Sequence, residues 1–349
     1  MFKFAQIIFL AGSMVCLSSL GHQSLAGNLT LPDGSKCEGQ ISNGALNGQG
    51  TCQFTNGDRY EGQFVEGEKK GQGKYIFADG GYFEGVFEDD QMGSKGVRVY
   101  ASQDRYEGEF VDGQPHGQGI YTTAAGLRYE GEFVDGQPTG KGTFIYTNGD
   151  RCSGTVVQGE LNGSGKCEYN NGDQYEGTLK NGQPDGEGIF RFAAGGEYEG
   201  EFQSGEFSGQ GTRIFANGNR FQGQFKQGLP SGQGQYNFAD GASYQGEIRD
   251  GQPAGEGIYT FANGNRYQGQ FVAGKFAGEG AFIFANGDRC QGQFSNNQLQ
   301  GMATCDYVNG DTFEGIFEQG KKNGKGVYSF ADGTRLEGVW KDDQYQERG

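Results

Sequence analysis

Cysteine is the residue type in this chain with the widest choice of chemistry, and six of the seven cysteines occur in pairs of identical spacing. The same interval separates the members of each pair: Cys37 and Cys52, Cys152 and Cys167, and Cys290 and Cys305. Such pairs form disulfides, bind zinc, or lie side by side as small buried thiols. Zinc is disfavoured because two ligands fall short of the usual four and no histidine lies near a pair. The remaining choice depends on how the fold places the two members of each pair.

The chain offers few other groups for catalysis. His116 is the only histidine after Ala26, and it stands in a Gln-Pro-His-Gly loop without a placed nucleophile, so we expect a surface residue. Glycine-rich stretches such as Gly117-Gln118-Gly119 superficially resemble phosphate-binding loops. They lead into expected strands instead of helices, and no Lys-Ser or Lys-Thr pair follows, so we expect no nucleotide site. These observations predict a protein that is not an enzyme and that has no cofactor.

Glycine recurs at one fixed interval through almost the whole sequence. A strict short period indicates one small unit that is copied and stacked. The binding surface of such an array is expected to be extended, in place of a single deep pocket. Each recurring glycine defines position zero of its repeat, and the set is Gly39, Gly62, Gly85, Gly108, Gly131, Gly154, Gly177, Gly200, Gly223, Gly246, Gly269, Gly292, Gly315 and Gly338.

Aromatic and polar residues alternate around each of these glycines, as in Tyr129-Glu130-Gly131-Glu132-Phe133. This period of two predicts a strand with one packed face and one solvated face. Further on, glycines stand at plus 9 and plus 11 and aromatics at plus 13 and plus 15, such as Tyr259 and Phe261, before an Asn-Gly or Asp-Gly turn. Each repeat is therefore expected to be a β-hairpin. Thirteen hairpins and a final half-repeat predict an all-β fold, an elongated, twisted, single-layer antiparallel meander.

The hairpin register decides what the cysteines do. If position minus 2 faces plus 13, then position zero faces plus 11, and glycine opposite glycine leaves a slot that neighbouring rings can fill. The cysteines occupy minus 2 and plus 13 of repeats one, six and twelve. We therefore predict three cross-strand disulfides, 37–52, 152–167 and 290–305, with three pairs of buried thiols as the alternative. Disulfides stabilise a thin sheet and are typical of exported proteins.

Acidic residues form two sets, one at position minus 1 and one in the turns. The glutamates at minus 1 recur too often to mark a unique glycosidase pair, and we interpret them as a solvated face that discourages edge association. The turn acids are turn formers, and calcium binding between units is disfavoured because the nonapeptide of calcium-binding β-rolls is absent. We therefore expect no metal site. The turn acids are Asp58, Asp150, Asp173, Asp288 and Asp311.

The segment that ends at Ala26 differs from the rest of the chain. A positive start that ends at Lys3 precedes a mostly apolar stretch, and Ser24 and Ala26 are small. This layout predicts a signal peptide over residues 1–26 that is cleaved after Ala26. An uncleaved anchor is the alternative, although the apolar stretch is short for a membrane span. The repeats then occupy residues 27–340, and residues 341–349 form a polar C-terminal tail.

The charge of the chain restricts its partners. It contains 28 lysines and arginines and 44 aspartates and glutamates. Loss of the leader removes only Lys3 among the charged residues, so the mature chain has 27 basic residues against 44 acidic ones, a net charge of −17. Such a chain is repelled by nucleic acid and by bare anionic lipid, and it attracts cationic partners. We expect an exported protein, periplasmic or extracellular, that binds no nucleic acid.

The succession Tyr-Glu-Gly-Glu-Phe, Gly-x-Gly and Tyr-x-Phe-x-Asn-Gly-Asp resembles the MORN repeat (membrane occupation and recognition nexus). The resemblance extends from about Gly34 to Trp340. Departures are few: Ser94 and Gln103 in the third unit, Ala303 in the twelfth, and the cysteines. The resemblance implies protein–protein interaction and, in several members, membrane association or homodimerisation.

These observations favour a non-enzymatic exported scaffold that mediates protein–protein interaction along its β-ribbon. One alternative is a module that binds anionic phospholipid through the arginines at minus 3, and another is a glycan-binding surface protein. A homodimer is also compatible with the sequence. Most aromatic residues are expected to pack within the ribbon, but a partly uncovered row would bind a partner. The candidate row is Tyr60, Phe64, Tyr106, Phe110, Tyr129, Phe133, Tyr198, Phe202, Tyr267 and Phe271.

Overall fold

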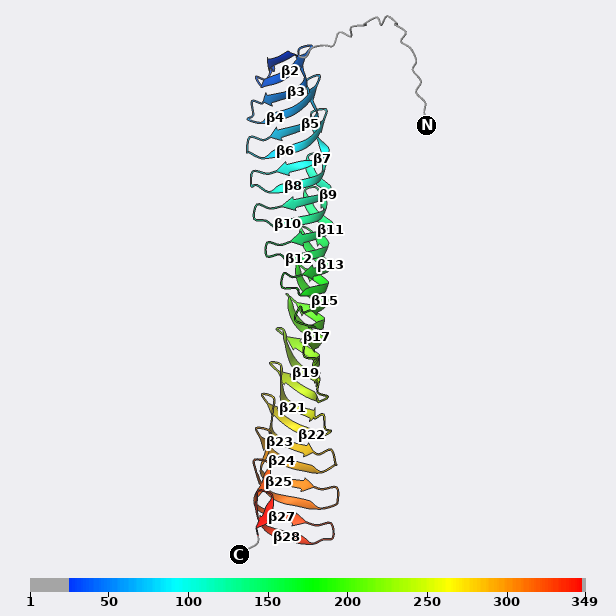
Figure 1. Ribbon diagram of the computed structural model, residues 1–349, viewed down its shortest axis with the longest axis vertical. Helices are drawn as coiled ribbons and strands as arrows, with labels where there is room; N and C mark the ends of the chain where they lie inside the picture. Colours follow the sequence, from blue (N-terminus) through cyan, green and yellow to red (C-terminus); the bar gives the residue numbers. More distant parts are fainter. Residues whose placement is uncertain (1–24, 347–349) are drawn as a thin grey trace, which may run out of the picture. The chain divides into compact units, whose positions relative to one another are not determined.

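The computed structural model describes residues 25–346, and within this range the chain forms 29 β-strands (Figure 1). The described residues contain no helix, and accordingly none that is long and apolar enough to cross a membrane. The chain divides after Gly117 into two compact units. The all-β meander that the sequence predicts is confirmed.

The first unit contains the first eight strands and the start of the ninth. They are β1 (Leu25–Thr30), β2 (Lys36–Ser42), β3 (Ala45–Gln53), β4 (Arg59–Val65), β5 (Glu68–Ile76), β6 (Tyr82–Glu88), β7 (Gln91–Val99), β8 (Arg105–Val111) and β9 (Gln114–Thr122).

The second unit contains the remaining strands. They are β10 (Arg128–Val134), β11 (Gln137–Ile145), β12 (Arg151–Val157), β13 (Glu160–Glu168), β14 (Gln174–Lys180), β15 (Gln183–Arg191), β16 (Gly196–Gln203), β17 (Glu206–Phe215), β18 (Arg220–Lys226), β19 (Leu229–Asn237), β20 (Ser243–Arg249), β21 (Gln252–Thr260), β22 (Arg266–Val272), β23 (Lys275–Ile283), β24 (Arg289–Ser295), β25 (Gln298–Asp306), β26 (Thr312–Glu318), β27 (Lys321–Ser329), β28 (Arg335–Lys341) and β29 (Gln344–Gln346).

Within each unit every strand pairs antiparallel with the next strand along the chain. The pairing runs from β1 to β8 in the first unit and from β10 to β29 in the second. The register is the expected one, because Tyr244 lies opposite Tyr259 and Gly246 lies opposite Gly257. Positions minus 2, zero, plus 11 and plus 13 therefore share one face of the sheet.

A β-bulge directly after the central glycine is a feature that the sequence did not predict. In the hairpin β20–β21 the register shifts between Gly246 and Ile248, so Glu247 has no partner residue across the hairpin. The Tyr244 hydroxyl donates a hydrogen bond to the Glu247 carbonyl at 2.7 Å and a longer one to the Ala254 carbonyl at 3.4 Å. The bulge thus gives the buried tyrosine hydroxyl its acceptors, as a buried polar group requires.

Aromatic rings at minus 2 and plus 2 form the core of the single layer. Tyr244 is fully buried, and its ring meets that of Phe271 in the next repeat edge to face, with centroids 5.0 Å apart. The Tyr244 ring also covers the glycine pair, since a Cβ added to Gly257 would come within 2.6 Å of it. The slot that the glycine pair was expected to leave is therefore filled by the ring of the same repeat.

Side chains in the turns join each turn to the next one. The backbone N–H of Ala193 donates to Asp173 Oδ1 at 2.8 Å, and the N–H of Ala285 donates to Asn265 Oδ1 at 2.9 Å. Each acceptor stands at plus 19 of its repeat, and each donor stands at the equivalent place in the following turn. Aspartate and asparagine serve equally here because both offer a side-chain oxygen.

The described residues include only part of the predicted signal peptide and of the predicted polar tail. The predicted signal peptide lies outside the described residues except for Leu25 and Ala26, which belong to β1. At the other end the predicted polar tail contributes a short strand, because Tyr345 in β29 pairs with Trp340 in β28. The tail therefore completes part of the last hairpin.

Candidate binding surface

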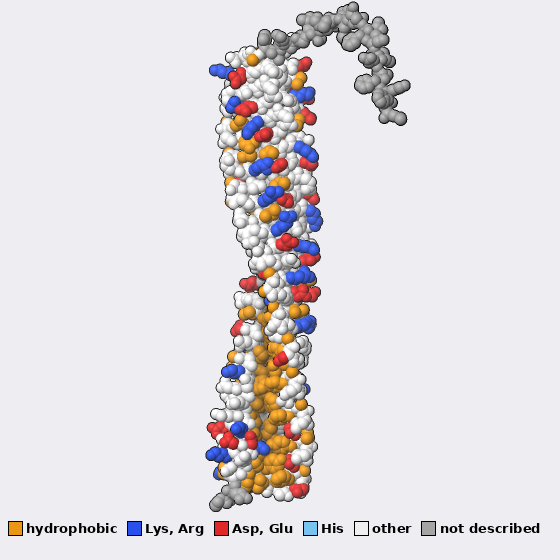
Figure 2. All heavy atoms as spheres, in the orientation of Figure 1, with side chains coloured by type: hydrophobic (Ala, Val, Ile, Leu, Met, Phe, Trp, Pro, Cys, Tyr) orange, Lys and Arg blue, Asp and Glu red, His pale blue; other side chains and the backbone are white. Residues whose placement is uncertain are grey.

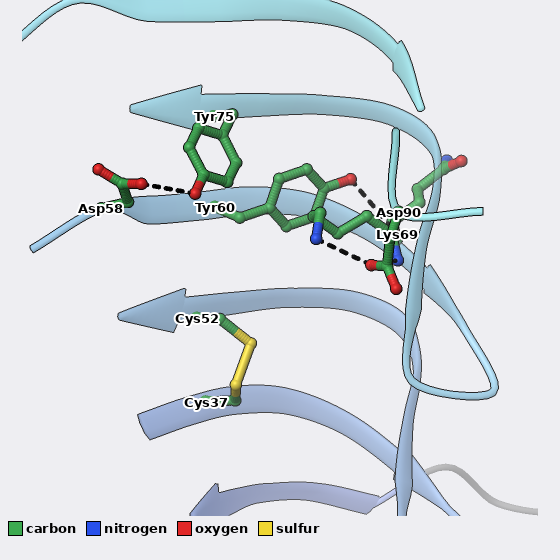
Figure 3. A network of polar contacts seen from close by, with 8 residues as sticks. Cys37, Cys52, Asp58, Tyr60, Lys69, Tyr75 and Asp90 are labelled. Carbon is green, nitrogen blue, oxygen red and sulfur yellow. Dashed lines mark hydrogen bonds and ion pairs between the residues drawn. A yellow bond between two sulfur atoms is a disulfide. The ribbon is translucent and has the colours of Figure 1, made fainter. Parts of the chain in front are cut away.

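The six paired cysteines are joined as three disulfides, the same pairs that the hairpin register predicts. The S–S distances are 2.04 Å for Cys37–Cys52, 2.07 Å for Cys152–Cys167 and 1.98 Å for Cys290–Cys305, and each bond connects directly opposed strand residues. Figure 3 shows the first of these bonds between β2 and β3. Disulfides persist in oxidising compartments, so the three bonds indicate an exported environment.

The turn acids are engaged in structural hydrogen bonds. Asp58 accepts the Tyr75 hydroxyl at 2.7 Å and the Ala78 N–H at 2.8 Å, and the bond from Tyr75 holds the pKa of Asp58 below its ordinary value (Figure 3). Asp311 has the same contacts with Tyr328 and the following turn. Among residues 25–346 no cluster of three or more histidines, cysteines or acids is arranged to hold a metal ion.

The aromatic row that the sequence nominated for binding is buried, so that assignment is wrong. Every one of its rings is at most 4% exposed, because each is covered by a ring of its own or a neighbouring repeat. A partner cannot reach this row without opening the core. The buried residues are Tyr60, Phe64, Tyr106, Phe110, Tyr129, Phe133, Tyr198, Phe202, Tyr267 and Phe271.

A different set of rings is accessible, at positions plus 13 and plus 15 of the second unit. Most of these rings are half-buried, Tyr236 is buried, and Phe284 is 41% exposed. Consecutive rings are in contact, with centroids between 4.8 and 6.5 Å apart. We refer to this continuous series as the aromatic ladder: Phe215, Tyr236, Phe238, Tyr259, Phe261, Phe282 and Phe284. Figure 2 shows a band of hydrophobic side chains along this part of the second unit.

Two features bound the aromatic ladder. At one end the guanidinium of Arg213 lies over the Phe192 ring, 3.4 Å from its centroid, and 5.4 Å from the centroid of Phe215. At the other end Cys305 occupies the plus 13 position of repeat twelve. The ladder therefore spans repeats eight to eleven without a charged or cysteine residue in the series.

Cationic side chains lie over the plus 15 rings of the first unit. The Arg98 guanidinium lies 3.5 Å from the centroid of Phe77, and the Lys69 ammonium lies 5.6 Å from that of Phe54. Lys69 also forms an ion pair with Asp90 at 2.8 Å. In the ladder of the second unit, Phe215 is the one ring with such a neighbour among the described residues, the guanidinium of Arg213.

The aromatic ladder lies on the same face of the sheet as the buried row, at positions that the alternation of residue types does not distinguish from it. Residues at plus 15 directly precede a turn, where fewer neighbouring side chains cover a ring than in the middle of a strand. The alternation of aromatic and polar residues assigns plus 15 and minus 2 to the same face, but it does not show which rings are covered by neighbouring side chains. Proximity to the turn was the available signal.

The opposite face of the sheet is polar. Arginines at minus 3 form ion pairs with glutamates at minus 1, such as Arg59 with Glu61 at 2.7 Å and Arg128 with Glu130 at 2.6 Å. All these groups are substantially exposed, so each pair contributes little to stability. The arginine stripe is thus largely neutralised in these repeats, as the sequence indicated. Near the C-terminal end this face also carries exposed apolar residues, Met302, Ile316 and Val339, of which Met302 is 59% exposed.

Thirteen consecutive segments between residues 37 and 335 match the family described as MORN repeat, and each segment has the length of one hairpin unit. The chain is a MORN-repeat protein. The matched segments begin at position minus 2, so each one contains a whole hairpin and the turn that follows it. No curated protein matches the sequence.

Several solved structures are distantly similar to this MORN-repeat chain. One is the TCP domain of Drosophila melanogaster SAS-4 in complex with a proline-rich motif of Ana2, with 17% identity, 44% of this chain, 85% of that chain and a TM-score of 0.29. A second is the TCP10 domain of Danio rerio CPAP with a STIL peptide, with 14% identity, 75% and 96% coverage and a TM-score of 0.21. A streptogramin B lyase has 14% identity, 93% and 88% coverage and a TM-score of 0.13. Similarities at this level carry no argument about function.

Proposed function

We propose that this MORN-repeat protein is a non-enzymatic exported scaffold that binds a protein partner along the aromatic ladder. The observation that carries the proposal is the continuous series of rings from Phe215 to Phe284, most of which are partly accessible. A contiguous apolar surface on a soluble protein is typical of an interaction site. The three disulfides support an oxidising location, either the periplasm or the extracellular space.

The distribution of polar groups supports a binding role over a catalytic one. The turn acids accept backbone N–H groups, and three of the arginines at minus 3, Arg59, Arg105 and Arg128, form ion pairs with glutamates on the polar face. In the described residues these contacts recur from repeat to repeat, whereas a catalytic site needs one distinctive constellation. The same pairing weakens the case for a lipid-binding arginine stripe.

Site-specific photo-crosslinking tests the proposal. The photoreactive residue benzoylphenylalanine would replace Phe284 on the aromatic ladder, and a matched chain would carry it in place of Met302 on the polar face. Both chains would be expressed in the exporting cell, irradiated there, and analysed by mass spectrometry. We expect protein adducts from position 284 and none from position 302. Lipid or glycan adducts at 284, or the same protein adducts at both positions, would reject a protein-binding ladder.

A further inference from the structure

The aromatic ladder has a regular pitch that restricts which extended ligand can follow it. The rings at plus 15 stand on every second strand of the sheet, on β17 and directly after β19, β21 and β23. Neighbouring strands lie about 4.8 Å apart, so successive rings at plus 15 lie about 9.6 Å apart along the sheet. From Phe215 to Phe284 the ladder therefore extends for about 29 Å, the length of three such intervals.

A ligand that contacts each plus 15 ring needs side chains that recur on one of its faces at about the spacing of the rings. A polyproline II helix has three residues per turn and rises 3.1 Å per residue, so one face recurs about every 9.3 Å. Over the whole ladder it drifts by about 1 Å. Two turns of an α-helix advance about 10.8 Å and drift by more than 3 Å over the same length. Side chains on one face of a β-strand recur about every 6.7 Å, which does not match the interval of about 9.6 Å between the plus 15 rings.

The net charge of the chain favours a cationic ligand for the aromatic ladder. Two of the four turns that directly follow its plus 15 rings contain an aspartate, Asp240 or Asp288. The arginines next to these turns stand at minus 3, on the opposite face of the sheet, and Arg213 lies beside Phe215 at one end of the ladder. The whole chain has a formal net charge of −16. A second copy of the chain has a ladder of the same pitch, but two such copies repel each other. A basic segment is attracted, and its association is accelerated by the field of the protein.

We infer that the ladder binds a proline-rich segment of a partner protein that carries lysine or arginine and adopts the polyproline II conformation. This inference rests on the proposed function and names the class of partner. About nine or ten residues of such a segment cover the ladder at 3.1 Å per residue. Its prolines pack on the rings from Phe215 to Phe284, as proline-rich segments do in other aromatic-lined grooves. Its basic side chains lie toward the acidic turns.

A peptide-binding measurement on the exported, disulfide-bonded protein tests the inference. The probe is a fluorescein-labelled twelve-residue peptide of four Pro-Pro-Arg triplets, and its binding is followed by fluorescence anisotropy. A peptide of four Gly-Gly-Arg triplets has the same charge without the polyproline II preference. We expect the proline peptide to bind about tenfold more tightly, because its conformation is ordered in advance. Equal binding of the two peptides would show that the interaction depends on charge alone, and this result would overturn the inference.

Two ring variants locate the bound peptide. Phe284 and Phe330 both stand at plus 15 and are 41% and 40% exposed, but only Phe284 belongs to the continuous ladder. Phe284→Ala is expected to weaken the proline peptide about tenfold, whereas Phe330→Ala changes its affinity less than about twofold. If Phe284→Ala unfolds, Phe284→Leu keeps most of the apolar volume and is expected to weaken binding as well. Equal losses in the Phe284 and Phe330 variants would contradict the assigned location.

The outcomes separate this inference from the proposed function. A protein adduct at position 284 without binding of the Pro-Pro-Arg peptide would reject the proline-rich ligand and leave the scaffold function in place. Absence of any protein adduct would reject both. Sedimentation of the protein with phosphatidylglycerol vesicles, or a dimer mass by light scattering that Phe284→Ala reduces to a monomer, would assign the ladder to a lipid or to a second copy. Either result overturns the inference.

Discussion

In the repeats with an aromatic residue at minus 2, the ring of that residue covers the glycine at plus 11. In repeat three, a Cβ at Gly96 would lie 2.6 Å from the Phe83 ring and 2.8 Å from the Glu84 carbonyl oxygen. Repeat twelve has Ala303 at this position, and there Cys290 replaces the aromatic residue at minus 2. Alanine is accommodated in repeat twelve because no ring covers the slot.

This relation predicts a difference between two glycine variants in the first unit. Gly96→Ala is expected to lower the free energy of unfolding by about 1–3 kcal/mol, because the added methyl group displaces the Phe83 ring. Gly50→Ala stands in repeat one, where Cys37 replaces the ring at minus 2. Its added Cβ would lie 3.1 Å from the Glu38 carbonyl oxygen and 3.2 Å from the Phe64 ring of the next repeat, farther than the Phe83 ring lies at Gly96. Urea denaturation should show a clearly smaller loss for Gly50→Ala. Equal losses would mean that backbone contacts, and not the ring, exclude alanine.

The buried tyrosines make stability sensitive to alkaline pH. Burial raises the pKa of Tyr129, Tyr244 and Tyr267 to about 12, above the value of about 10 in an unfolded chain. The folded protein therefore retains protons that the unfolded chain releases, and stability is full below about pH 10 and declines as pH rises toward 12. Urea melts between pH 8 and pH 11.5 measure this decline. Tyr244→Phe should make it shallower, and a constant unfolding free energy to pH 11.5 would exclude the effect.

At the scale of the elements, each hairpin depends on a bulge and on a turn that is fastened to the next turn. The sequence predicts that the turn acids are turn formers, and in the structure their oxygens accept backbone N–H groups of the following turn, as Asp173 does from Ala193 at 2.8 Å. Repeats with asparagine, such as that of Asn265, form the same contact. The repeated element is therefore a hairpin with a connector to its successor.

The connector can be tested by a matched pair of substitutions. Asp173→Ala leaves the Ala193 N–H without its acceptor and is expected to lower the unfolding free energy by about 1–2 kcal/mol. Asp173→Asn retains an oxygen at the same place and should remain within about 0.5 kcal/mol of the parent protein. Thermal melts of the three proteins provide the comparison. An Asn variant as unstable as the Ala variant would show that the negative charge matters more than the acceptor.

At the scale of the whole molecule, stability is distributed over many similar hairpins, and the disulfides reinforce three of them. Each disulfide closes a hairpin between cysteines with a sequence separation of 15. In repeat proteins each unit depends chiefly on its immediate neighbours, so the loss of one bond acts locally.

Reduction of the disulfides is therefore expected to loosen three hairpins and spare the rest. Each cross-link of about this loop length contributes about 3 kcal/mol in the chain-entropy treatment. Hydrogen–deuterium exchange after reduction should accelerate first in β2–β3, β12–β13 and β24–β25. The hairpin β20–β21 contains no cysteine and serves as an internal control. Uniform acceleration in all hairpins would indicate that the chain unfolds as one cooperative body.

The repeat period, the hairpin register and the cysteine pairing followed from the sequence because all three depend on local geometry. A side-chain period of two and a short turn determine which residues oppose each other, so Cys152 opposite Cys167 could be derived from counting. The all-β class and the family followed from the same pattern. The bulge after Gly246 could not be derived, since the two extra residues of β21 opposite Glu247 leave the aromatic spacing of the sequence unchanged.

The alternation of residue types assigns the rings to one face of the sheet, but the packing of successive repeats fixes which rings are accessible. Tyr267 and Phe284 lie on the same face by alternation, yet the first is fully buried and the second is 41% exposed. The two rings differ in coverage: a neighbouring repeat places Phe294 against Tyr267, whereas Phe284 lies directly after β23, beside the turn. Coverage depends on how successive repeats stack, and that is a property of the assembled array.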